Sequence, residues 1–115
     1  MLVKEYSRPA AGKVIRPQDL RTLETLVKTT NYLVNEVYNR YDVEFIQIYE
    51  FLFDRFRAIR QDFIIQRCSE SDAIQILCII LRFYILADYK LCFYKNYDEF
   101  MNFQHLSEVY HIIVF

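Results

Sequence analysis

The chain almost lacks the two residue types that most strongly interrupt helices. Its single glycine, Gly12, and its two prolines, Pro9 and Pro17, all lie near the start, so residues 18–115 contain neither type. Inside a helix, glycine and proline cost about 1 and 3 kcal/mol relative to alanine, and both mark turns and loops. A segment this long without them predicts an all-α body.

The same residues divide the chain into two regions. Residues 1–20 hold the glycine and both prolines and are rich in basic side chains, so we expect an extended basic arm. Residues 21–115 are expected to form the helical part. The basic side chains of the arm are candidate contacts for a polyanion or a partner: Lys4, Arg8, Lys13 and Arg16. An arm that docks along its own helical domain is an equally open alternative.

Apolar spacing and capping residues predict about four helices. The first begins after Thr22, a residue type that caps helix N-termini, and ends near Asn39. The second covers about 43–66, the third about 72–94, and the fourth begins after Asp98. The third is apolar on nearly every side, which is typical of a helix covered by several neighbours. Helices that follow one another about every 25 residues predict a helical-repeat-like array.

The composition disfavours several classes of partner. A net charge of -1 argues against a general polyanion binder, since phosphate binding depends on clustered positive charge. Residues 76–87 are the most apolar stretch, but Arg82 interrupts it, and a membrane span needs about 20 apolar residues. We therefore expect no membrane partner.

No pattern typical of an enzyme or a cofactor site is present. A single glycine excludes phosphate-binding loops and dinucleotide fingerprints. His105 and His111 point to different sides of one helix, and no cysteine accompanies them at the spacing of metal ligands. The interpretation is a non-enzymatic chain with no catalytic residue, cofactor, metal or small-molecule substrate. The alternative, a small helical enzyme, would need a perturbed acid–base pair in a deep pocket.

The cysteines and the C-terminal aromatic residues are expected to be structural. Cys68, Cys78 and Cys92 lie mostly in apolar runs and predict reduced, buried thiols in an intracellular protein. An aromatic series is expected to form core and helix–helix interface, because few basic residues accompany it; stacking on RNA bases is the alternative. Its members are Tyr84, Tyr89, Phe93, Tyr94, Tyr97 and Phe100.

Residues 52–63 combine an apolar helical stripe with arginines. The stripe consists of Leu52, Phe56, Ile59 and Phe63. Charged residues flank it: Asp54, Arg55, Arg57, Arg60 and Asp62. The arginines either contact RNA or an acidic partner, or they pair within the chain. We favour the structural role, because a nucleic-acid surface excludes carboxylates, and we expect Arg55 and Asp62 to be the ends of a polar network.

Two strings of residues resemble the Sac-three/GANP family of nuclear mRNA-export scaffold proteins. The first is Tyr6-Ser7-Arg8-Pro9-Ala10-Ala11-Gly12, and the second runs from Asp54 to Phe63 with Asp-Arg-x-Arg-x-Ile-Arg-Gln-Asp-Phe. They occur in the family's order, with a Thr-Thr-x-Tyr-Leu stretch at 29–33 between them. Residues 5–13 are most similar to the shorter, Sac-three-domain-containing members that are linked to centrosomes.

The resemblance implies a scaffold that acts through protein–protein contacts in the export of poly(A) mRNA. It implies two partners, a PCI-domain protein and a small acidic DSS-type subunit, and a location at the nuclear pore, in the nucleus and in the cytoplasm. The shorter members imply an alternative, a centrosome or spindle factor in cell division. Family members continue with a winged-helix module, so we expect a fragment truncated before that module, with weak RNA binding. The apolar ending at 112–115 leads to the same expectation.

Overall fold

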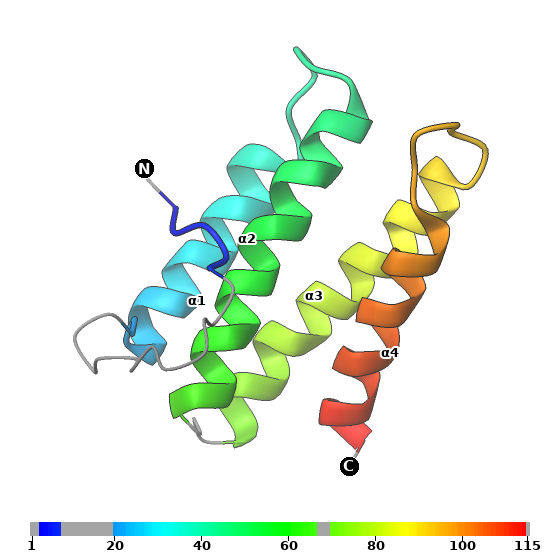
Figure 1. The fold of residues 1–115 in the computed structure, drawn as a ribbon. Coiled ribbons are helices and arrows are strands. Elements are labelled where there is room, and N and C mark those ends of the chain that lie inside the picture. The colour runs from blue at the N-terminus through cyan, green and yellow to red at the C-terminus, as the bar shows by residue number, and fades with distance from the viewer. Residues whose placement is uncertain (1–2, 8–19, 67–69, 115) are drawn as a thin grey trace. The chain divides into compact units, whose positions relative to one another are not determined.

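The computed structural model describes residues 3–7, 20–66 and 70–114, and within these ranges it contains helices and no β-strand. The elements are α1 (Leu23–Tyr32), a π-helical segment η2 (Leu33–Val37), α2 (Phe45–Gln66), α3 (Glu70–Leu91) and α4 (Glu99–Val114) (Figure 1). The predicted all-α fold of about four helices is therefore confirmed. The chain divides into two compact units, Met1–Ser69 and Glu70–Phe115. The arm boundary at residue 20 stays a prediction, because residues 8–19 lie outside the described ranges.

The first helix begins where its capping residue predicts. Thr22 has an extended backbone, and its hydroxyl accepts a hydrogen bond from the Thr25 amide at 3.2 Å. This bond satisfies one of the donors that every helix N-terminus leaves open. Thr29 and Thr30 are buried, and their hydroxyls donate to the carbonyls of Thr25 and Leu26, so both polar groups are satisfied inside the helix.

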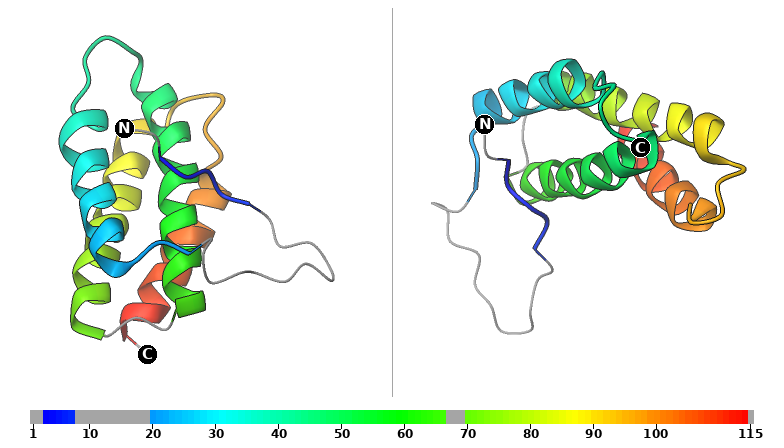
Figure 2. Two further views of the ribbon diagram at one scale, coloured as in Figure 1. Left: turned by 90° about the vertical axis from the view of Figure 1, so that its left-hand side faces the viewer. Right: turned by 90° about the horizontal axis from the view of Figure 1, so that it is seen from above.

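The core of the first unit lies between α1 and α2, which run side by side in both views of Figure 2. All four residues of the predicted apolar stripe on α2 are at most 5% exposed. From the other helices and the start of α2, the buried apolar residues are Leu26, Leu33, Ile48 and Tyr49.

In the loop before α2, the Arg40 guanidinium hydrogen-bonds Asp42, which lowers the pKa of that carboxyl and raises the pKa of the arginine. Both side chains are exposed, so water screens the pair.

The second unit is a hairpin of α3 and α4, held together by polar as well as apolar contacts. Asn102 of α4 is 1% exposed, and its amide donates to the Tyr84 carbonyl of α3 at 3.0 Å. In the connection between the helices, the Tyr97 hydroxyl donates to Asp88 at 2.8 Å. The fourth helix is capped as predicted, since Asp98 accepts a hydrogen bond from the Met101 amide.

Two expectations about burial are wrong for this unit. In the aromatic series Tyr84 and Tyr97 are buried, but the other four side chains are exposed: Tyr89, Phe93, Tyr94 and Phe100. The third helix, expected to be covered by several neighbours, exposes Ile74, Ile85 and Leu86 together with Tyr89. A periodic pattern identifies apolar positions, but it does not identify what covers each of them.

The cysteines also depart from the expectation. Cys92 is exposed in the turn after α3, Cys78 is half-buried, and both are free thiols. The prediction of buried thiols is therefore wrong for Cys92, because the helix ends at Leu91 and leaves the next residue in a solvated turn. Cys68 lies outside the described residues. Among the helices that the structure describes, none has the length and apolarity that a bilayer span requires.

Candidate functional site

One face of α2 carries four polar residues around a buried alanine. Asp54, Arg55, Gln61 and Asp62 stand three or four positions from Ala58, so their side chains surround it on the helix surface. Ala58 has an exposure of 0% although it is at the centre of a polar face. The N-terminal segment 3–7, dark blue in Figure 1, lies against this helix. A small residue at the centre allows another backbone to approach closely.

Asp62 is the buried anchor of this face. Its side chain is 1% exposed, and its two oxygens lie 3.0 Å from the Lys4 ammonium and 2.9 Å from Nε of Arg21. The Arg21 backbone amide also donates to it at 3.3 Å. A buried carboxylate is tolerated when opposite charges and hydrogen bonds replace its hydration. Asp62 thereby connects α2 to Lys4 and Arg21, which lie 58 and 41 residues before it in the sequence.

Asp54 and Arg55 hold the middle of the segment. Asp54 accepts a hydrogen bond from the Tyr6 backbone amide at 3.3 Å and one from Arg55 at 3.0 Å. Arg55 also reaches Glu5 at 3.3 Å, and its guanidinium lies 4.1 Å from the centre of the Phe51 ring. Glu5 is largely exposed, so its ion pair contributes little. The backbone bond to Asp54 is the more specific of these contacts.

Arg57 and Gln61 complete the attachment. The Arg57 guanidinium lies 4.0 Å from the centre of the Tyr6 ring, a cation–π contact, and Gln61 donates to the Ser7 carbonyl at 3.0 Å. Both residues lie within one helical turn of Asp54 or Ala58. The segment 3–7 is thus bound through side chains and backbone together, which fixes its position more firmly than charge alone would.

The structure brings together some of the residues that the sequence singled out. Asp54, Arg55, Arg57 and Asp62 all contact the N-terminal region, and Lys4 bonds Asp62. Arg60 is 5% exposed and is not among the residues that surround Ala58. The other candidate contacts of the arm, Arg8, Lys13 and Arg16, lie outside the described residues. The assignment of functional roles to all of these residues stays a prediction.

Sequence reasoning missed several members of the site. Tyr6 was noted as part of a motif, but its partner is a helix about fifty residues away, and no local spacing reveals such a contact. Arg21, at the start of the predicted helical part, is grouped by its charge with the basic arm and not with Asp62, and neither Ala58 nor Gln61 is singled out by its pattern. One signal was available for Ala58, because a small apolar residue inside a polar face indicates a closely approaching neighbour.

The contacts at this site hold two parts of one chain together. Among the described residues no group of three or more histidine, cysteine or acidic side chains is placed to hold a metal. The contacts are ion pairs, hydrogen bonds and a cation–π contact between parts of one chain. Such an arrangement fixes the N-terminal segment on α2 and leaves the arginines of the string engaged within the chain.

Comparison with known proteins decides the family. The sequence model of the SAC3/GANP family matches residues 1–114. The chain belongs to the SAC3/GANP family. The resemblance of the two strings is therefore confirmed, and the second string is the part of α2 that binds the N-terminal segment in this family member.

Two relatives agree with this assignment. SAC3 family protein B of Arabidopsis thaliana is 30% identical over 94% of this chain. SAC3 family protein 1 of Schizosaccharomyces pombe is 36% identical over 85% of it. The chain spans only 7% and 10% of the length of these two relatives. No solved structure matches the chain.

Proposed function

We propose that this chain is part of a non-enzymatic scaffold that acts through protein–protein contacts in the export of poly(A) mRNA from the nucleus. Membership of the SAC3/GANP family supports the proposal. One observation carries it: the arginine-rich string of α2 binds the N-terminal segment of the same chain. Arginines that are engaged in this way support a folded framework and do not form an open basic surface for RNA.

The proposed partners are a PCI-domain protein and a small acidic DSS-type subunit. Both are proteins, and protein partners suit a second unit that exposes large apolar side chains. The proposed location is the nuclear pore, with presence in the nucleus and the cytoplasm. In this account the α2 site keeps the framework rigid, so that partners meet a defined surface.

Depletion of the endogenous protein tests the export role. A degron fused to the endogenous gene removes the protein, and hybridisation with an oligo(dT) probe then measures poly(A) RNA in the nucleus and the cytoplasm. We expect nuclear poly(A) RNA to accumulate and the wild-type gene to reverse this. Asp62→Leu should fail to rescue because it removes the buried anchor of the site. Asp42→Asn, which changes an exposed carboxylate of the same unit, should rescue fully.

The alternative centrosome or spindle role gives a different result. Unchanged poly(A) RNA together with defective spindles and a tagged protein at the centrosome would replace the export proposal by that alternative. Imaging the tagged protein in the same cells separates the two outcomes directly.

A further inference from the structure

The fourth helix carries an exposed apolar stripe beside the face that packs against α3. Asn102, His105 and Val109 are buried on the face that packs in the hairpin with α3. At 100° per residue, five apolar residues of α4 fall within an arc of about 120° to one side of this face. They are Phe100, Phe103, Leu106, Tyr110 and Val114. Phe100 and Phe103 are 78% and 64% exposed, which is unusual for phenylalanines on a regular helix.

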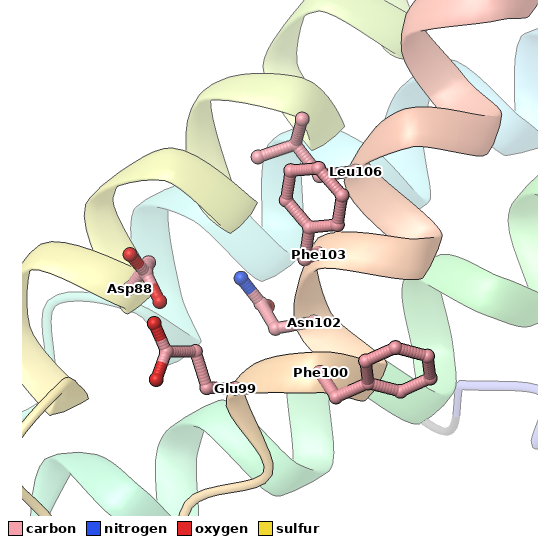
Figure 3. Close-up of a pocket in the computed structure, with 6 residues that line it drawn as sticks. All are labelled: Asp88, Glu99, Phe100, Asn102, Phe103 and Leu106. Carbon is pink, nitrogen blue, oxygen red and sulfur yellow. The ribbon is translucent and has the colours of Figure 1, made fainter.

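The start of this stripe borders a hollow of about 400 Å³. Its lining consists of Asp88, Glu99, Phe100, Asn102, Phe103 and Leu106. Figure 3 shows the carboxylates of Asp88 and Glu99 directed toward one another from α3 and α4, with Phe103 and Leu106 along the following turns of α4 and the Phe100 ring directed away from both carboxylates. The hollow is therefore apolar along α4 and negatively charged at the end where α4 begins.

The charge of this hollow is not balanced by its lining. No basic residue lines it, and the second unit as a whole contains six acidic residues and three basic ones. Asp88 is half-buried and oriented by the Tyr97 hydroxyl, and Glu99 stands in the first turn of α4, where the helix dipole favours a carboxylate. Both negative charges thus lie at the edge of an exposed apolar surface.

We propose that this groove docks a segment of a partner protein that combines an arginine with apolar side chains. The guanidinium lies between Asp88 and Glu99, and the neighbouring apolar residues cover Phe100, Phe103 and Leu106. Arginine suits the site better than lysine, because its planar group donates to two carboxylates at once and stacks on aromatic rings. RNA does not suit it, since phosphates would meet two carboxylates. The groove lies in the second unit and is independent of the site on α2.

Peptide binding to the whole chain tests the proposal. The probes are fluorescein-labelled peptides that contain one arginine and two leucines at every spacing from one to four residues, each paired with a counterpart in which glutamate replaces the arginine. Fluorescence anisotropy measures their dissociation constants. We expect the best arginine peptide to bind at least about tenfold more tightly than its counterpart, because a charge-assisted pair is replaced by repulsion.

Substitutions at the groove and outside it locate the binding. Glu99→Gln and Phe103→Ala should each weaken the best peptide by about five- to tenfold. The matched controls are Glu108→Gln, an exposed glutamate of the same helix, and Phe93→Ala, an exposed phenylalanine of the preceding turn, and both should leave the dissociation constant unchanged. All four side chains are exposed, so circular dichroism should show the same helical content for every variant.

Three results would overturn the proposal. The first is that no peptide of the set binds with a dissociation constant below about 1 mM, the range of non-specific contact. The second is that norleucine replaces arginine without loss, which would make the groove purely apolar. The third is that Glu99→Gln and Phe103→Ala bind as the wild type does, which would move the contact elsewhere.

Discussion

At the scale of single residues, Asp62 determines how the N-terminal region meets α2. Its carboxylate is buried, and it accepts bonds from Lys4 and from both the backbone and the side chain of Arg21. A buried ion pair contributes little by itself, since desolvation offsets the Coulomb attraction. Its removal is costly for a different reason, because the remaining charges lose their partner. The site is therefore more sensitive to single substitutions than its net contribution to stability suggests.

Replacing the anchor should destabilise the first unit. Asp62→Asn preserves the size of the side chain but leaves Lys4 and Arg21 without an opposite charge, so the free energy of unfolding should fall by about 2 to 3 kcal/mol. Urea unfolding followed by circular dichroism measures the change. Asp42→Asn, in an exposed pair, should change it by less than about 0.5 kcal/mol. Equal effects of the two substitutions would mean that burial of Asp62 has no energetic consequence.

The sequence predicted part of this site, and the reason for the rest is physical. Carboxylates within an arginine string indicated internal pairing, and the helical period placed Arg55 and Asp62 on one face. The partners of these residues could not be predicted. Tyr6 and Lys4 reach α2 only when the chain folds back on itself, and the spacing of residues within a helix carries no information about such a contact. A contact between segments so far apart depends on chain topology, and one sequence alone does not specify it.

At the scale of elements, two helices begin at the residues that the sequence predicted. The Thr22 hydroxyl and the Asp98 carboxylate each accept a hydrogen bond from the third amide of their helix. Capping is a local interaction, so sequence identifies it well. Burial is not local, and for this reason the expectations for α3 and the aromatic series were wrong. The predicted limits of the helices were close, but the uncovered face of α4 was not predicted.

Removing either cap should loosen the first turn of its own helix. Thr22→Ala and Asp98→Ala each delete one acceptor, and such losses cost about 1 kcal/mol. Exchange of the Thr25 amide should then be about fivefold faster in the first variant, and exchange of the Met101 amide in the second. Hydrogen exchange followed by NMR measures both amides in each protein, so each variant serves as the control for the other. Acceleration of both amides by one substitution would contradict a local cap.

At the scale of the whole molecule, charge is distributed unevenly between the ends. The arm contains the four predicted basic contacts, and Lys4 pairs with Asp62, so the predicted polyanion contact depends on Arg8, Lys13 and Arg16. The arginines Arg55 and Arg57 are likewise engaged with residues 5 and 6. Any nucleic-acid affinity of this chain is therefore expected to be weak and to come from the part of the arm that follows residue 7.

Salt dependence tests this expectation. Three phosphate contacts predict a slope of about -2 to -3 for the logarithm of the association constant against the logarithm of salt concentration. Replacing Arg8, Lys13 and Arg16 by glutamine should abolish binding to single-stranded RNA in a filter or anisotropy assay, with little dependence on sequence. Arg57→Gln should leave the RNA affinity unchanged. Tight binding that survives the triple substitution would assign the nucleic-acid contact to α2.

The N-terminal segment docks on α2 through Asp62, and a double-mutant cycle measures this contact directly. Lys4→Met and Asp62→Asn are combined, and urea unfolding gives the free energy of each variant. We predict a coupling energy of about 1 to 2 kcal/mol, since the pair is partly buried. The exposed pair of Lys28 and Glu24, 3.3 Å apart on α1, should couple by no more than about 0.5 kcal/mol. Strict additivity of Lys4→Met and Asp62→Asn would contradict the account, because it would mean that the two side chains do not meet in solution.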